Sequence, residues 1–151
     1  MEYSKRAREL FKQGYNCSQS VFGAFCNKTG LPFEKAVAIA SSFGGGMGGQ
    51  RDYCGAVTGA FMVVGALLGD YSPLDNDAKS KHYQLIRQIA EKFKGEFSTC
   101  ICRELLANLP KKLEQTPLPR TDEYYKIRPC VLFVEYAAKI VEEMLNIGIS
   151  E

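Results

Sequence analysis

The apolar run from Ala56 to Leu68 constrains the fold of this chain more than any other segment. Thr58 alone interrupts it, and the run is too short to cross a bilayer, which takes about 20 residues of helix. A helix that is apolar on every side belongs in the interior of a globular protein. We therefore predict a buried central helix over residues 54–68, and no membrane span.

Two glycines mark one side of this helix as a contact surface. Gly55 and Gly59 lie four residues apart, so they share a face on which a second backbone can approach closely. We expect that face to pack tightly against a neighbouring helix, and changes at either glycine to damage the packing.

The remainder of the chain is also predicted to be helical. Apolar residues at helical spacing, with glycines and prolines at the ends, predict helices over 2–13, 17–27, 33–42, 76–94, 102–108 and 129–145. Gly95 is expected to end one helix, and Pro110 to Pro129 to form an irregular crossing loop. No segment alternates as a strand does. We expect an all-α fold with residues 1–151 in a single domain, a bundle of about five to six helices with a glycine-rich loop before the central one.

Cysteines lie where four of the predicted helices begin. The unpaired N–H groups and positive macrodipole of a helix start favour thiolate over thiol. The apolar spacing around each of these cysteines turns it inward, so the four are predicted to meet at one end of the bundle. They are Cys17, Cys54, Cys102 and Cys130.

The remaining two cysteines are interpreted differently. Cys100 forms a Cys-x-Cys pair with Cys102, and we rank it as a substitute ligand. Cys26 lies near the end of its predicted helix, so we expect a core thiol without a role. The alternative for every cysteine is that it packs as a small hydrophobic residue.

A loop of five glycines and one methionine, from Gly44 to Gly49, precedes the central helix. Successive glycines leave backbone N–H groups free to point into a concavity. With Arg51 nearby, these groups are candidates to donate hydrogen bonds to the sulfur of Cys54 or to a bound inorganic centre; the alternative is a tight connection between crossing helices. The candidate cofactor-binding positions are Gly45, Gly46, Gly48, Gly49 and Gly55.

Composition and missing motifs exclude several functions. With 19 Lys and Arg against 17 Asp and Glu, the net charge of +2 gives no argument for nucleic acid. His82 is the only histidine and no two cysteines are separated by two residues, so the usual zinc-finger and thioredoxin patterns are absent. The charged N-terminus has no apolar core of a signal peptide. We expect a cytoplasmic protein, where cysteines are more often catalytic, redox-sensing or metal-binding than disulfide-bonded.

These motifs, in this order, resemble a family of redox-active proteins named C_GCAxxG_C_C for its four-cysteine pattern. The resemblance runs from about residue 17 to residue 145 and rests on the segments 16–20, 43–48, 54–59 and 102–106 and on the Cys130 helix. The family label writes GCAxxG where this chain has Cys54-Gly-Ala-Val-Thr-Gly59. The resemblance implies a small, mostly helical bacterial or archaeal protein, redox-active and often encoded near transporter genes.

Three functions remain open from the sequence. In the first, the four helix-start cysteines hold an iron–sulfur cluster or zinc. In the second, the protein is a metal-free thiol–disulfide oxidoreductase, with Cys54 as the attacking thiolate and Cys17, Cys102 or Cys130 as the resolving cysteine. In the third, the chain is a non-enzymatic accessory domain. Its partner would be an unknown redox protein or a transporter-associated protein, docking on residues 110–129. A homodimer is compatible with all three.

Overall fold

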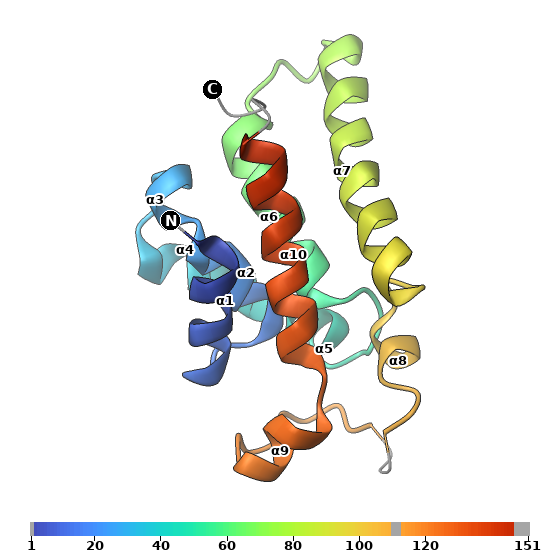
Figure 1. Cartoon of the computed structure of the whole chain (residues 1–151). Coiled ribbons are helices and arrows are strands. Elements are labelled where there is room, and N and C mark those ends of the chain that lie inside the picture. Colours follow the sequence, from blue (N-terminus) through green and yellow to red (C-terminus); the bar gives the residue numbers. More distant parts are fainter. Residues whose placement is uncertain (1, 110–112, 147–151) are drawn as a thin grey trace.

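The computed structural model describes residues 2–109 and 113–146, and the fold is all-α as predicted (Figure 1). The longer helices are α1 (Tyr3–Lys12), α2 (Cys17–Ala24), α4 (Phe33–Ala40), α6 (Gly55–Leu68), α7 (Asn76–Phe97) and α10 (Cys130–Met144). Short helical segments join them: α3 (Cys26–Thr29), η1 (Ser41–Phe43), α5 (Gly44–Met47), α8 (Cys102–Leu105) and α9 (Asp122–Ile127). These short segments raise the number of helices above the five to six expected. Within the described residues, the only β-pairing is an isolated bridge between Tyr53 and Ile101.

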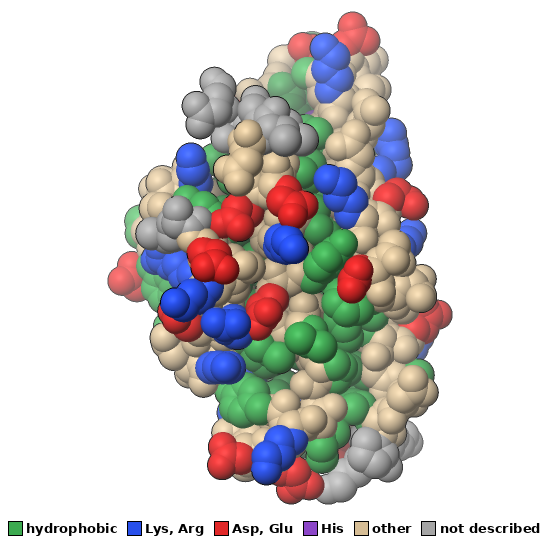
Figure 2. Space-filling view, viewed as in Figure 1, with side chains coloured by type: hydrophobic (Ala, Val, Ile, Leu, Met, Phe, Trp, Pro, Cys, Tyr) green, Lys and Arg blue, Asp and Glu red, His purple; other side chains and the backbone are tan. Residues whose placement is uncertain are grey.

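The apolar run forms α6, which contacts α2, α7 and α10. Figure 1 shows α10 crossing in front of α6, with α1 and α2 on one side and α7 on the other. Val57, Val63 and Val64 of α6 are fully buried. None of the helices in the described part of the chain is both long and apolar enough to cross a membrane. Figure 2 shows Lys, Arg, Asp and Glu side chains spread over the face of the molecule that is seen in Figure 1.

The glycine face of α6 lies against the first turns of α2. A Cβ atom on Gly59 would lie 2.9 Å from the carbonyl oxygen of Ser18 and 3.0 Å from Cβ of Val21. A Cβ atom on Gly55 would lie 3.3 Å from Cβ of Cys17. The two backbones therefore approach as closely as the sequence predicts, and this contact places Cys17 beside the start of α6.

Helix α7 continues past Gly95, where we expected it to end. It stops at Ser98, which adopts a left-handed φ of 76°. The extra turn brings the ring of Phe97 to 4.9 Å from that of Phe133 and 5.5 Å from that of Tyr136 in α10. Glycine in a helix costs about 1 kcal/mol relative to alanine, and this aromatic packing offsets that cost.

Two other helix boundaries differ from the prediction for reasons of packing. The helix expected over 17–27 breaks at Phe25, which is fully buried and stacks on Tyr3 with ring centroids 4.3 Å apart. The helix expected over 33–42 ends at Ala40, and η1 continues it as a tighter turn. The segments that follow the two breaks, α3 and η1, contain no buried residue, so each break ends the part of the helix that packs in the core.

The segment predicted as an irregular crossing loop contains the helix α9. Residues 110–112 lie outside the described part of the chain. Thr121 caps α9 by accepting a hydrogen bond from the N–H of Tyr124, and Asp122 and Glu123 occupy the first turn, where acidic residues are favourable. The Thr121 cap followed by two acidic residues is the sequence pattern from which α9 could have been predicted.

A pair of glycine substitutions in α6 tests the close contact with α2. Gly59→Ala should destabilise the fold by about 1–3 kcal/mol, because its Cβ overlaps the α2 backbone. Gly65→Ala is the matched control in the same helix, since nothing lies within 4 Å of its Cβ, and it should stabilise by up to about 1 kcal/mol. Urea unfolding monitored by circular dichroism measures both. Equal effects of the two changes would contradict the contact.

Candidate functional site

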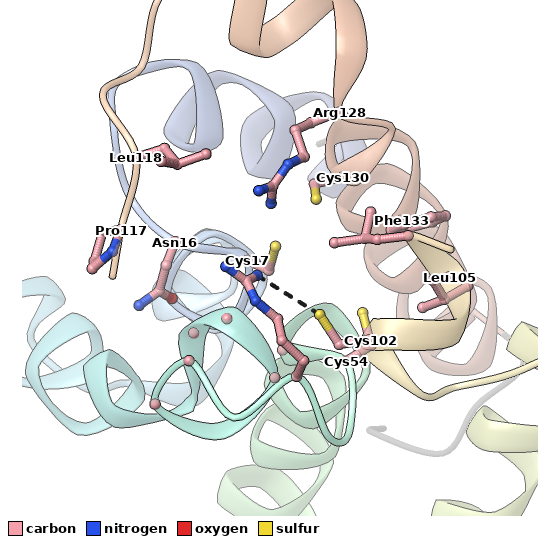
Figure 3. Close-up of a pocket in the computed structure, with 18 of the residues that line it drawn as sticks. Asn16, Cys17, Cys54, Cys102, Leu105, Pro117, Leu118, Arg128, Cys130 and Phe133 are labelled. Carbon is pink, nitrogen blue, oxygen red and sulfur yellow. Dashed lines mark hydrogen bonds between the residues drawn. The ribbon is translucent and has the colours of Figure 1, made fainter. Parts of the chain in front are cut away.

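A cavity of about 310 Å³ lies where the starts of α2, α6, α8 and α10 come together (Figure 3). All four helix-start cysteines line it. Cys17, Cys102 and Cys130 are the first residues of their helices, and Cys54 immediately precedes α6. In Figure 3 the labelled sulfur atoms lie on one side of the space, and Asn16, Pro117 and Leu118 lie on the other. The structure thus brings to one place the cysteines that the sequence singles out.

Asn16 fixes the start of α2 and ties it to the glycine-rich loop. Its side chain accepts a hydrogen bond from the N–H of Gln19, and the side chain of Gln19 accepts one from the N–H of Asn16, which forms a capping box. The amide of Asn16 also donates to the carbonyl of Ser41, and its side chain covers Gly44 so closely that no Cβ fits there. Cys17 is therefore held at a defined position at the edge of the cavity.

The glycine-rich loop forms a single turn of left-handed helix. The φ angles of Gly45, Gly46, Met47, Gly48 and Gly49 are 64°, 66°, 72°, 63° and 83°. An L-residue in this conformation costs roughly 1–2 kcal/mol, which explains why glycine occupies four of the five positions. The sequence predicts no regular element here, and the left-handed turn is one that only such a composition tolerates.

Some N–H groups of the left-handed turn form hydrogen bonds within the turn itself. The N–H groups of Gly48 and Gly49, which we expected to point toward sulfur, donate to the carbonyl of Gly44 instead. Gly45, Gly46, Gly48 and Gly49 line the cavity as backbone walls. A Cβ on Gly46 would lie 2.7 Å from Cβ of Cys102, so the backbone of the turn packs directly against the side chain of Cys102.

Gly55 also lines the cavity, but its surroundings point to packing. A Cβ atom there would lie 2.9 Å from the carbonyl oxygen of Phe43 and 3.2 Å from the backbone nitrogen of Ser18. The chain comes this close on two sides only because Gly55 has no side chain.

Arg51 connects the cysteine side of the cavity to the segment that crosses it. Its Nη1 lies 3.9 Å from Sγ of Cys102, the contact dashed in Figure 3, and its Nε donates to the carbonyl of Glu114 at 3.2 Å. The carbonyl of Arg51 accepts from the N–H of Arg103 at 3.0 Å, which holds the start of α8 against the loop. Residues 113–121 thereby form one wall of the cavity.

Cys17 and Cys130 form a hydrogen-bonded pair of thiols. The hydrogen bond from Cys17 lowers the pKa of Cys130 to about 7, and the nearby guanidinium groups of Arg128 and Arg51 act in the same direction. The same hydrogen bond, together with burial, raises the pKa of Cys17. Cys130 is therefore the more acidic thiol of the pair, and Cys17 is the one that keeps its proton.

The other two cavity cysteines are held as thiols. Burial raises the pKa of Cys54 to about 12, although the N–H groups of Val57 and Ala56 at the start of α6 oppose this shift. Burial also raises the pKa of Cys102, with Arg51 opposing. The sequence interpretation gave the attacking role to Cys54. In the structure, burial of Cys54 outweighs the effect of the helix start on its pKa, whereas the pKa of Cys130 is lowered.

The charged lining of the cavity has one sign. Arg51, Arg120 and Arg128 line it, and the described lining residues include no Asp or Glu. Arg120 donates to the carbonyls of Phe11 and Tyr15 at 2.8 and 2.9 Å, and its guanidinium lies 4.2 Å from the centre of the Phe11 ring. The sequence analysis missed Arg120 and Arg128 as site residues. The signal was a basic residue two positions before a helix-start cysteine, in Arg128-Pro129-Cys130.

The remaining candidates lie elsewhere. The thiol of Cys100 donates to the carbonyl of Ala90 in α7 at 3.7 Å, and Cys100 is not among the residues that line the cavity. Cys26 is half-buried in α3, and His82 packs beside Tyr71 with ring centroids 5.5 Å apart. In residues 2–109 and 113–146, no three His, Cys, Asp or Glu side chains are arranged to hold a metal ion as they stand.

The fold and the cavity define an all-helical protein in which four cysteines line one cavity. A family model described as "Putative redox-active protein (C_GCAxxG_C_C)" matches residues 15–144, and the chain belongs to this family. No curated protein and no solved structure is significantly similar to it.

The lowered pKa of Cys130 predicts its reactivity with iodoacetamide. In the reduced, metal-free protein at pH 7, Cys130 should react on the order of ten times faster than Cys26, whose pKa burial raises. The rate at Cys130 should fall as the pH decreases through about 7, because the thiolate becomes protonated. Mass spectrometry of the labelled peptides measures each site. A faster reaction at Cys54 would contradict the assignment.

Proposed function

We propose that this redox-active protein binds an iron–sulfur cluster in its four-cysteine cavity, for electron transfer or sensing. The observation that carries the proposal is the convergence of four cysteines, from four separate helix starts, on a cavity of about 310 Å³. Iron–sulfur clusters are held by cysteine thiolates, usually four. A dithiol mechanism needs only two of these residues, so it leaves the other two without a role.

The charge of the cavity supports a negatively charged occupant. A buried charge is costly unless it is paired, and three arginines line the cavity without a carboxylate among the described lining residues. An iron–sulfur cluster with four thiolate ligands carries a net negative charge, which these guanidinium groups would balance.

Cys17, Cys54, Cys102 and Cys130 would hold the cluster, which when bound supplies one-electron redox chemistry. The protein's own contribution would be electrostatic. The Nη1 group of Arg51, 3.9 Å from Sγ of Cys102, is placed to donate toward sulfur, and such donors raise a reduction potential. Zinc would use the same four residues and would make the site structural or regulatory.

Metal and sulfide analysis of protein purified without oxygen tests this proposal. We expect iron, acid-labile sulfide and visible absorbance in the wild-type chain. Cys54→Ser and Cys130→Ser should lose them, because each removes a proposed ligand. Cys26→Ser is the matched control and should retain them, because Cys26 lies outside the cavity. Zinc alone, no metal, or equal loss in all three variants would overturn the cluster assignment.

A second candidate is thiol–disulfide exchange, which the Cys17–Cys130 pair favours. The Cys130 thiolate would attack a substrate disulfide and form a mixed disulfide, releasing one thiolate. Cys17 would then pass its proton to a released thiolate and attack the sulfur of Cys130, releasing the second half of the substrate. The net reaction reduces one substrate disulfide to one thiol and one thiolate and oxidises Cys17 and Cys130 to a disulfide.

Oxidised glutathione is a probe for this second candidate. In metal-free protein it should produce a Cys17–Cys130 disulfide, identified by mass spectrometry of unreduced peptides. Cys17→Ser should instead accumulate a mixed disulfide on Cys130, since nothing resolves it, and Cys26→Ser should behave as wild type. A disulfide that joins a different pair would exclude this mechanism. The redox partner and the link to a transporter remain predictions.

A further inference from the structure

We infer that the cavity recognises a small anionic molecule through Arg128. The substrate that reacts with the cavity thiols would then carry a carboxylate or a similar oxyanion. This inference deepens the second candidate function, thiol–disulfide exchange, by naming a substrate class, and it rests on that function only for the redox role of the thiols. The charge selectivity itself follows from the arginine and the cavity around it.

Arg128 differs from the other two arginines of the cavity in its partners. Only 8% of its surface is exposed, and its guanidinium contacts the thiol of Cys130, but within the described residues it forms no ion pair with a carboxylate and no hydrogen bond to a backbone carbonyl. Arg51 and Arg120, the other cavity arginines, both donate to such carbonyls. A guanidinium has five N–H donors, so the Cys130 sulfur satisfies only part of them, and an anion from outside the chain would satisfy the others.

The direction of Arg128 identifies where that anion would bind. Its guanidinium lies 5.3 Å from the centre of the Tyr124 ring, and Figure 3 shows the side chain reaching into the cavity beside Cys130. A guanidinium presents parallel N–H donors that match a carboxylate or another planar oxyanion face. An anion bound there would lie next to the two paired thiols, Cys17 and Cys130.

The dimensions of the cavity favour a small molecule over a protein side chain as the source of the anion. A volume of about 310 Å³ is at the lower end of the range of ligand pockets. The segment 113–121 crosses the space opposite the cysteines, with Pro117 and Leu118 in the wall. Leu105 and Phe133 add apolar surface that suits a short carbon chain.

The alternative is that Arg128 serves only the thiolate of Cys130 and recognises nothing else. The two accounts predict different behaviour toward a pair of reagents. Iodoacetate and iodoacetamide transfer nearly the same group to sulfur, but only iodoacetate carries a carboxylate. Both react with the thiolate, so the ratio of their rates at one cysteine cancels the ionised fraction of that cysteine.

The experiment measures this rate ratio in the reduced, chelator-treated chain of residues 1–151, by mass spectrometry of each labelled peptide. Cys26 is the reference within the same molecule, because it is half-buried and lies outside the cavity. We expect the iodoacetate-to-iodoacetamide ratio at Cys130 or Cys17 to exceed that at Cys26 on the order of tenfold, because a confined positive charge concentrates anions.

Variants at Arg128 assign the selectivity to this residue. Arg128→Gln should lower the ratio to that of Cys26, and Arg128→Lys should keep most of the excess because it keeps the charge. Arg103→Gln is the matched control. This exposed arginine pairs with Asp52 at 2.8 Å, and its loss should leave the ratio unchanged. Circular dichroism confirms that each variant is folded, and Arg128→Lys remains informative if Arg128→Gln is not.

Three results would overturn the inference: a wild-type ratio equal to that of Cys26, an excess that survives Arg128→Gln, or cavity thiols that react with neither reagent. Each is independent of the metal analysis. A chain without iron that retains the Arg128-dependent ratio would refute the cluster and support the anion site, and the opposite result would do the reverse.

Discussion

The close approach of α2 to α6 is the contact on which the site depends. Gly55 and Gly59 let the first turn of α2 lie directly on the α6 backbone. That contact brings Cys17 beside Cys54, although 36 residues, 18 to 53, separate them in the sequence. Helix α10 packs on both helices and adds Cys130. The N–H of Cys102, the first residue of α8, donates to the carbonyl of Asp52 and holds this helix beside them. The cavity is the space left where these backbones meet.

Much of this arrangement follows from sequence patterns, and the exceptions share a physical cause. The apolar run predicts α6, and the apolar neighbours of each helix-start cysteine predict its inward direction. Local patterns fail where tertiary packing determines the end of a helix. Helix α7 continues through Gly95 because the ring of Phe97 packs against those of Phe133 and Tyr136. Arg128 could not be placed from the sequence, because its burial depends on how α9 meets α10.

The comparison of Cys54 with Cys130 shows what a helix start contributes to thiol chemistry. Both lie at the beginning of a long helix, so both have nearby N–H groups and the same end of a macrodipole. Burial without a neighbouring cation raises the pKa of Cys54 to about 12. Cys130 has a hydrogen-bonding partner in Cys17 and a guanidinium in Arg128, and its pKa is lowered. Position at a helix start is therefore a weaker influence than neighbours and solvation.

The left-handed glycine turn has a consequence for how the site assembles. Glycine loses more backbone freedom on ordering than any other residue, so the segment from Gly44 to Gly49 is the least favourable stretch of the chain to fix. Its neighbours hold it from three sides: Asn16 at Gly44, Cys102 at Gly46 and Gln115 at Gly49. Two of these neighbours, Asn16 and Cys102, stand at the starts of helices, so the conformation of the turn depends on contacts with those helices. An occupant that touches this wall would therefore contribute binding free energy to the segment with the largest entropic cost of ordering.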